Sequence, residues 1–266
     1  MDNHHRKVLH SVQGDKCIEV VDQGEFRSLY FKNSVIQSRL YHKAPEKLAL
    51  RYTQYMMAAA LLAVPDPARV LLIGVGAGAL LHFFDHYFQG TRIDGVDNSD
   101  HIIKIARGFF SVPENNYISI HCEDGLKYLN SLEDSTSYDL ILVDAFNDDG
   151  MAKTIYSNEF FKLAKRKLSS KGVICCNLWS GNDAAFTRVQ KAMQKYSASR
   201  VYIPVRQREN VIALLFQTEL SWKTLSPSKS VLQDLSNTYG FDFREVAAAM
   251  RKHNMKIGEQ MQLWFS

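Results

Sequence analysis

The spacing of hydrophobic and polar residues changes near residue 70. Before that point, "KCIEVVD" and "RSLYF" are rich in β-forming residues and flank the turn candidate "QGEF", and a turn at Lys32–Ser34 precedes "VIQSRLY". This pattern predicts an N-terminal β-hairpin unit of about three strands. Residues 45–63 then place apolar side chains at i, i+3 and i+4, with Pro45 in the first turn, and predict a helix.

From Val70 onward, apolar runs alternate with amphipathic stretches, which predicts strands alternating with helices. The predicted strands are residues 70–75, 92–98, 117–123, 138–146, 172–179 and 211–217, and the predicted helices are residues 79–88, 99–110, 124–132, 157–168 and 183–196. This order is typical of an α/β fold with a doubly wound, Rossmann-like sheet. Because "SRVYIPV" and "ENVIALLFQ" have no crossover helix between them, they predict a C-terminal antiparallel hairpin, with one edge strand running antiparallel.

These patterns divide the chain into three predicted parts. Residues 1–44 form a small N-terminal β-strand domain, residues 45–222 form the α/β domain, and residues 223–266 form a C-terminal helical extension. The extension carries no recognisable motif, so we expect its short helices to pack against the rest of the chain.

Composition narrows the class of protein. With 266 residues, 46% of them hydrophobic and 23% charged, the chain has an ordinary globular composition and can bury a large core. No apolar run reaches the length of about 18 residues that a membrane span requires, and the N-terminus has no signal-peptide core. The four cysteines form no C-x-x-C pair, which indicates reduced structural thiols. We therefore expect a cytoplasmic protein with no membrane partner.

Charge and histidine spacing argue against two further classes. The net charge of +4 is diffuse, and its densest cluster, Lys162–Gly172, has the spacing of a solvated helix face rather than of a nucleic-acid site. His82 and His86 share a helical face, but they have neither the glutamate of an H-E-x-x-H motif nor a third ligand. We expect no nucleic-acid partner and no metal.

The predicted carboxyl ends of four strands carry glycines or carboxylates, and ligands of open α/β sheets bind at such ends. The first strand ends in Gly74-Val75-Gly76-Ala77-Gly78, and the second ends at Asp97, about 20 residues later, where an acid can accept both hydroxyls of a ribose. The third ends in Glu123-Asp124-Gly125 and the fourth at Asp144. Each feature alone fits a turn or a helix cap, but the ordered set predicts an adenosine-containing ligand.

The glycine spacing leaves two ligands open. Gly74, Gly76 and Ala79 satisfy the permissive G-x-G-x-x-A pattern of dinucleotide sites, which keeps NAD as an alternative. Against NAD, the sheet ends in a hairpin where a second mononucleotide half is needed, and Asp124-Gly125 has no role in that pattern. A ligand of the S-adenosylmethionine type would use Asp124 for its adenine amino group.

Between Ile18 and Phe216 the chain resembles the spermidine synthase family. The resemblance rests on "IEVVDQGEFRSLYFKNSVIQ", "RYTQYMMAAALLAVPDPARVLLIGVGAGAL", "IDGVDNSDHIIKIAR", "CEDGLKYL" and, most specifically, "YDLILVDAFNDDG…NEFFKLAKRKLSSKGVICCNL". It implies a sheet of the class I methyltransferase type preceded by a small β-domain, and a homodimer formed through that β-domain. It also implies transfer of the aminopropyl group of decarboxylated S-adenosylmethionine to putrescine or a related amine.

The resemblance implies a role for each site residue. The donor would be held by Gly74, Gly76, Gly78, Asp97, Asp124, Gly125 and Gln37. Asp97 would bind the ribose hydroxyls, Asp124 the adenine amino group, and Asp144 would be the general base or orienter of the attacking amine. Tyr52 would assist Asp144 and, with Gln37, line the substrate side. A polyamine needs an acidic, partly aromatic pocket, which would be supplied by Phe146, Asn147, Asp148 and Asp149.

Three positions depart from the family pattern. Ala77 stands where the family has an aspartate that holds the aminopropyl nitrogen, Thr53 where it has a histidine, and Asn147 where it has a second aspartate. Ala77 with free backbone N–H groups would suit the carboxylate of intact S-adenosylmethionine, which favours an S-adenosylmethionine-dependent methyltransferase as the alternative. A ligand-binding member that has lost catalysis is the third interpretation.

Overall fold

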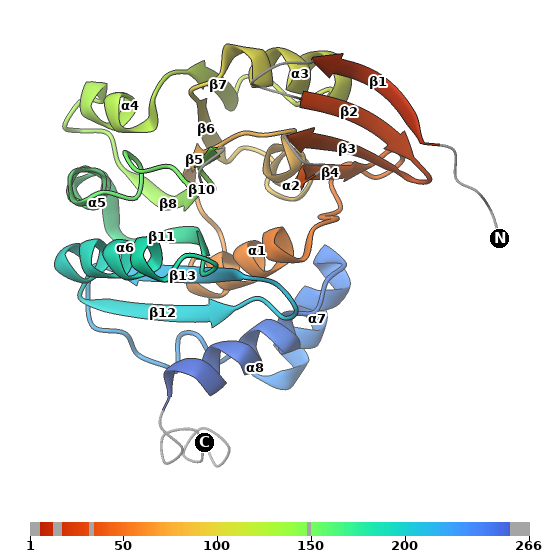
Figure 1. Cartoon of the computed structure of the whole chain (residues 1–266). Coiled ribbons are helices and arrows are strands. Elements are labelled where there is room, and N and C mark those ends of the chain that lie inside the picture. The colour runs from red at the N-terminus through yellow and green to blue at the C-terminus, as the bar shows by residue number, and fades with distance from the viewer. Residues whose placement is uncertain (1–5, 13–17, 32–34, 148–149, 256–266) are drawn as a thin grey trace.

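The N-terminal part of the chain is a four-stranded antiparallel sheet in the order β1-β2-β3-β4. Our computed structural model describes residues 6–12, 18–31, 35–147 and 150–255. The strands are β1 (Lys7–Val12), β2 (Ile18–Gln23), β3 (Phe26–Phe31) and β4 (Val35–Tyr41). The sheet buries Val20, Leu29 and Leu40 against the main body, beside α2 and α3 (Figure 1). The sequence predicted about three strands, and β1 is the additional one.

The main body is a seven-stranded sheet in the order β12-β13-β11-β8-β5-β6-β7. Its strands are β5 (Arg69–Ile73), β6 (Arg92–Asp97), β7 (Ile118–Cys122), β8 (Tyr138–Val143), β11 (Leu168–Trp179), β12 (Ser199–Pro204) and β13 (Asn210–Phe216). β5, β6, β7, β8 and β11 are parallel, and the chain reverses direction across the sheet between β5 and β8. The carboxyl ends of β5 and β8 therefore form the crevice where such sheets bind ligands. The predicted doubly wound sheet of the class I methyltransferase type is confirmed.

The C-terminal hairpin is confirmed, but its predicted place in the sheet was wrong. β13 runs antiparallel to both β11 and β12, so the antiparallel strand lies inside the sheet. The edge strand β12 consequently runs in the same direction as the parallel strands. Because β13 is buried on both faces, its residues read as a continuous apolar run, "VIALLF", and such a run pairs favourably on two sides.

Helices cover both faces of this sheet (Figure 1). α1 (Arg51–Ala63), α2 (Ala79–Tyr87) and α3 (Asp100–Phe110) pack on one face together with α7 (Lys229–Tyr239) and α8 (Phe243–Asn254), while α4 (Gly125–Ser131), α5 (Asn158–Arg166) and α6 (Asp183–Tyr196) pack on the other. Side-chain caps at Ser99, Asp124, Ser157 and Asn182 fix the starts of α3, α4, α5 and α6. No helix in the described part of the chain is long and apolar enough to cross a membrane.

One helix start differs from the sequence prediction. The helix predicted over residues 45–63 begins at Arg51, because the preceding residues form turns that lead away from β4. The amide of Lys47 donates to the carbonyl of Ala44, which itself bridges to Tyr41. The shorter helix still carries Tyr52 in its first turn. Its position beside the carboxyl end of β8 brings that tyrosine to the crevice.

Candidate functional site

The glycine loop after β5 is in direct contact with the end of β8. The amide of Asp144 donates to the carbonyl of Ile73, and the amide of Gly74 donates to the carbonyl of Val96, each at 2.8 Å. Gly74 has a φ of +95°, and a Cβ added to it would lie 2.1 Å from the carbonyl oxygen of Asp144. Only glycine fits there, because both the backbone conformation and the space exclude a side chain.

Asp97, at the end of β6, holds the glycine loop in place. Its Oδ2 accepts from the amides of Val75 at 3.0 Å and Gly76 at 3.4 Å, while its Oδ1 accepts from Ser99 at 3.0 Å. Burial raises the pKa of the Asp97 carboxyl, and these three amide donors act against that rise. The sequence assigned Asp97 to a ligand, and the structure adds a second task, which is to order the loop below it.

Asp124 and Gly125 begin α4 at the end of β7. The Oδ1 of Asp124 caps the helix by accepting from the amides of Leu126 and Lys127 at 3.0 and 3.1 Å. Both bonds use the same oxygen, which leaves Oδ2 to meet a ligand. A Cβ on Gly125 would lie 2.9 Å from Cγ2 of Ile73, so this glycine lets α4 approach β5 closely.

Asp144 receives two side-chain hydrogen bonds from neutral groups. The hydroxyl of Tyr52 donates to its Oδ2 at 3.1 Å, and Nδ2 of Asn177 donates to its Oδ1 at 2.8 Å. The same tyrosine hydroxyl lies 3.4 Å from the backbone carbonyl oxygen of Gln37 in β4, which places the N-terminal sheet at the edge of the site. The predicted catalytic pair, Asp144 and Tyr52, is therefore together.

Asn177 is hydrogen-bonded to a second asparagine, Asn210. Asn177 is 2% exposed, and its Oδ1 accepts from Nδ2 of Asn210 at 2.9 Å. Because the Asp144 carboxylate only accepts, the NH₂ side of the Asn177 amide faces it, and the carbonyl side faces the Asn210 donor. The hydroxyl of Tyr156 adds a bond of 2.6 Å to the backbone carbonyl oxygen of Asn177. Neither asparagine was predicted from the sequence, although Asn177 is a polar residue within the apolar run of β11.

The Asp144 carboxylate is held by neutral donors rather than by a cation from the described residues. Burial raises the pKa of its carboxyl, and the bonds from Asn177 and Tyr52 lower it only in part. Burial and the neighbouring Asp144 charge raise the pKa of Tyr52, which keeps its phenol protonated as a donor. None of the described lysines, arginines or histidines forms an ion pair with Asp144. A negative charge that is half removed from water and has no positive partner is costly, so the site is complementary to a cationic ligand.

Removal of one donor should shift the Asp144 titration. Asn177→Ala deletes a hydrogen bond that favours the charged carboxylate, so we expect the pKa of Asp144 to rise by about one unit. Carboxyl carbon NMR shifts across a pH series, in protein labelled at aspartate, measure this change. Tyr52→Phe deletes the other donor and should act in the same direction. The Asp94 carboxyl, which is bonded to Arg69 and Tyr138, is the internal control. An unmoved Asp144 titration in Asn177→Ala contradicts the assignment.

The predicted acceptor residues lie just beyond Asp144. Phe146 and Asn147 form the short strand β9 (Phe146–Asn147), which pairs with β10 (Gly150–Met151). The Phe146 ring centroid lies 6.4 Å from that of Tyr156, and Asn147 is exposed. Asp148 and Asp149, both predicted to face the amine, lie outside the described residues.

Two of the unusual positions are buried away from the crevice. Ala77 is fully buried in the apolar cluster beneath the loop, and Thr53 donates its hydroxyl to the carbonyl of Leu50 at 2.7 Å. The amides of Val75 and Gly76 are already bonded to Asp97. The loop therefore offers fewer free N–H groups to a donor carboxylate than the methyltransferase interpretation required.

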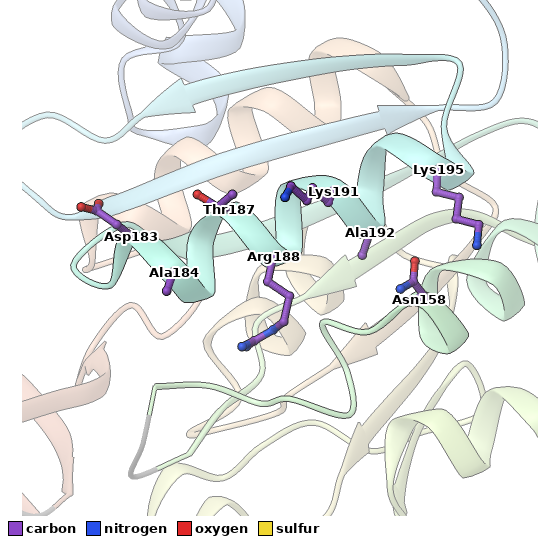
Figure 2. Close-up of a pocket in the computed structure, with 8 residues that line it drawn as sticks. All are labelled: Asn158, Asp183, Ala184, Thr187, Arg188, Lys191, Ala192 and Lys195. Carbon is purple, nitrogen blue, oxygen red and sulfur yellow. The ribbon is translucent and has the colours of Figure 1, made fainter.

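A hollow of about 710 Å³ lies between α5 and α6, apart from these residues (Figure 2). Figure 2 shows Arg188, Lys191 and Lys195 along its α6 side, with Asn158 contributed by α5. Three cationic side chains repel an ammonium group, so this hollow does not suit an amine. The strand ends around Asp144 remain the candidate site.

Comparison with known proteins points to one family. The model of the spermine/spermidine synthase domain matches residues 49–223. The chain is 27% identical over 260 residues to the polyamine aminopropyltransferase of Neisseria meningitidis, covering 97% of this chain and 98% of that protein. It is 29% identical over 252 residues to that of Chromobacterium violaceum, covering 94% and 95%. A probable spermidine synthase from Corynebacterium glutamicum has the same fold, with a TM-score of 0.71, 19% identity and coverage of 91% and 94%.

Proposed function

Because the chain belongs to the spermine/spermidine synthase family, we propose that it transfers the aminopropyl group of decarboxylated S-adenosylmethionine to putrescine or a related diamine. The protein is a transferase. The observation that carries the choice of acceptor is the half-buried Asp144 carboxylate, which has two neutral hydrogen-bond donors and no cationic partner among the described residues. An amine that arrives as an ammonium supplies the missing positive charge.

The reaction requires little more of the protein than positioning and proton removal. The amine nitrogen forms a bond to the aminopropyl carbon attached to the donor sulfonium, and the carbon–sulfur bond breaks with its electron pair going to sulfur. The products are the extended polyamine and neutral methylthioadenosine. The attacking nitrogen must be held in line with that carbon and must have lost a proton. The Asp144 carboxylate takes or orients this proton, and Tyr52 with Asn177 keeps it aimed at the amine.

The donor subsite is proposed from the strand ends. Asp97 and Asp124 are each fixed by backbone amides and keep unused lone pairs, which would accept from ribose hydroxyls and from the adenine amino group. Gly74, Gly76 and Gly78, all with positive φ, form the loop over which the donor lies.

Assembly and location are also proposals. The four-stranded N-terminal sheet ends in β1, which among the described strands pairs with β2 alone, and an edge of this kind supports the homodimer that the family resemblance implies. We propose that the protein works in the cytoplasm on small molecules, without nucleic-acid or membrane partners.

Donor preference and turnover test the proposal together. In calorimetric titration, decarboxylated S-adenosylmethionine should bind at least about tenfold more tightly than intact S-adenosylmethionine. Incubation with the decarboxylated donor and putrescine should release methylthioadenosine and an aminopropylated amine, which mass spectrometry detects. Tighter binding of intact S-adenosylmethionine, with methyl transfer to an acceptor, would replace aminopropyl transfer by the methyltransferase alternative.

The variant Asp97→Ala tests the proposed donor subsite. It removes the proposed ribose acceptor and also the partner of the Val75 and Gly76 amides, so donor affinity should fall by about a hundredfold or more. Circular dichroism and denaturant unfolding confirm that the variant is folded before titration. Unchanged affinity in a folded variant removes Asp97 from the donor site.

A further inference from the structure

Glu209 presents a carboxylate that is held in place although the residue is exposed. It lies in the turn between β12 and β13, immediately before Asn210. The amide and the hydroxyl of Ser180 each donate to its backbone carbonyl at 2.8 Å, and Nε1 of Trp179 donates to its Oε2 at 2.7 Å. None of the described residues bonds to its Oε1. The side chain is thus fixed on one oxygen and open on the other.

The Trp179 indole packs against the backbone of two glycines, Gly150 and Gly181. A Cβ added to Gly150 would lie 3.5 Å from Cε3 of the indole, so the backbone of β10 packs on this ring. A Cβ added to Gly181 would lie 2.3 Å from Cζ2 and 2.9 Å from Oε2 of Glu209. The backbone at Gly181 therefore approaches the indole more closely than any side chain would allow, while a Cβ at Gly150 would be in ordinary van der Waals contact. The ring therefore has little freedom, and its N–H holds the Glu209 carboxylate in one place.

This carboxylate is connected to the catalytic one through the sheet. Trp179 lies opposite Asn210 in the β11–β13 ladder, and Asn210 bonds Asn177, which bonds Asp144. Trp179 is two residues beyond Asn177 along β11, a step of roughly 7 Å. Asp144, Asn177 and Asn210 are thus joined by hydrogen bonds, and Glu209 directly precedes Asn210 in the chain, so both carboxylates lie at the carboxyl edge of the sheet.

A diamine has a use for both carboxylates. At neutral pH each nitrogen is an ammonium, and the reacting nitrogen must give up its proton beside Asp144. The other nitrogen keeps its charge throughout the reaction, and a carboxylate beside it can accept a charge-assisted hydrogen bond from it. We propose that Glu209 binds this distal ammonium and that Trp179 is the positioning residue for Glu209. This inference rests on the proposed function, since it names a subsite of the same acceptor.

Two arginines share the turn with Glu209 and bear on this assignment. Nη1 of Arg206 lies 3.9 Å from Oε1 of Glu245, so its charge is partly offset by that acid. The Arg208 side chain is exposed, where water and salt screen it. The Glu209 carboxylate is held by Trp179, and the Glu209 backbone carbonyl is held by Ser180, so this carboxylate is the group that a bound ammonium meets.

The test compares a diamine with its one-ended analogue, 1,4-diaminobutane against 1-aminobutane. In the wild type, the diamine should have the lower KM. Glu209→Gln keeps the shape and removes the charge, so KM for the diamine should rise by about tenfold or more with kcat nearly unchanged. KM for the monoamine should stay the same. Glu219→Gln is the matched control, because Glu219 is another exposed acid with a side-chain partner, Ser199, at the opposite end of β13.

A second variant separates positioning from direct binding. Trp179→Phe keeps an aromatic ring and removes the N–H donor, so KM for the diamine should rise by less than in Glu209→Gln, while the monoamine is unaffected. Equal changes for both amines in either variant overturn the proposal, because a distal subsite acts only on the distal nitrogen. Equal KM values for the two amines in the wild type overturn it as well.

Failure of the proposed function gives a different result. If the wild type transfers nothing to either amine, aminopropyl transfer to these acceptors is rejected. Calorimetric titration of the methylthioadenosine-loaded protein with 1,4-diaminobutane then tests the subsite alone. Weaker diamine binding in Glu209→Gln than in the wild type supports the subsite, and equal binding overturns it.

Discussion

Asp144→Asn is expected to lower kcat by about a thousandfold while the affinity for the donor changes by less than about tenfold. The amide has nearly the shape of the carboxylate, but it carries no charge to balance an ammonium and no basic oxygen to take a proton. The amide oxygen of the new side chain can still accept from Nδ2 of Asn177, so the hydrogen bond is kept while the charge is lost. Steady-state kinetics with putrescine, together with donor titration, separate the two effects.

The pH dependence of the rate follows from the environment of the Asp144 carboxyl. Burial raises the pKa of Asp144 above its ordinary value, so the wild-type rate should fall on the acid side at a higher pH than an ordinary carboxylate gives. The folded-state pKa lies above the unfolded one, so this group costs stability as pH rises through the two values. Asp144→Asn removes that cost and should raise the melting temperature at pH 7. A variant that is less active and also less stable would indicate a misfolded site.

Asp139→Asn is the matched control for this prediction. Asp139 lies on the same strand at its opposite end, where its Oδ2 accepts from the amides of Ala68 and Arg69 and its Oδ1 from Ser169. Its replacement should lower stability with kcat retained. A large loss of kcat in Asp139→Asn would mean that any disturbance of β8 abolishes turnover, and Asp144 would lose its special role.

Gly74→Ala is expected to reduce the free energy of unfolding by about 4 kcal/mol or more. The new methyl group would meet the Asp144 carbonyl oxygen at 2.1 Å, and alanine is also strained at a φ of +95°. Relief of this contact requires the glycine loop to separate from the end of β8, so donor binding should be lost as well. Denaturant unfolding followed by circular dichroism measures the change.

Gly90→Ala distinguishes the contact from the backbone conformation. Gly90 has a φ of +94°, almost the same as that of Gly74, but a Cβ there would meet nothing within 4 Å. It should therefore cost only about 1 kcal/mol, the strain of the conformation itself. Equal losses in the two variants would show that φ alone sets the cost and that the close approach to Asp144 is unimportant.

The sequence predicted those parts of the site that depend on strand order. In a parallel sheet all strands end at one edge, so the residues that follow apolar runs, such as Gly74, Asp97, Asp124 and Asp144, meet there whatever the exact pairing. The alternation of strands and helices also predicted the doubly wound sheet. The roles of these residues stay predictions until the variants are measured.

The two asparagines behind Asp144, Asn177 and Asn210, could not be predicted in the same way. Their contact depends on β13 entering the sheet between β11 and β12, which places Asn210 opposite Trp179, 31 residues away in the chain. A shift of one residue in that antiparallel register would turn Asn210 to the other face of the sheet. Apolar runs such as "CCNLW" and "VIALLF" do not specify their partner or their register, so the contacts of Asn177, Asn210 and Glu209 could not be predicted from the sequence.

The C-terminal helix α8 has a consequence for how this protein can vary. Its Glu245 accepts from the hydroxyl of Tyr55 at 2.8 Å and from Arg51 at 3.1 Å, and these two residues flank Tyr52 in the first turns of α1. At its other end, Asn254 bonds both backbone groups of Tyr202 in β12. α8 thus connects the edge strand β12 to α1, the helix that carries Tyr52. It lies beyond residues 49–223, which match the family model. A substitution in this segment would therefore change the support of the helix that carries Tyr52, with Tyr52 and Asp144 themselves left unchanged.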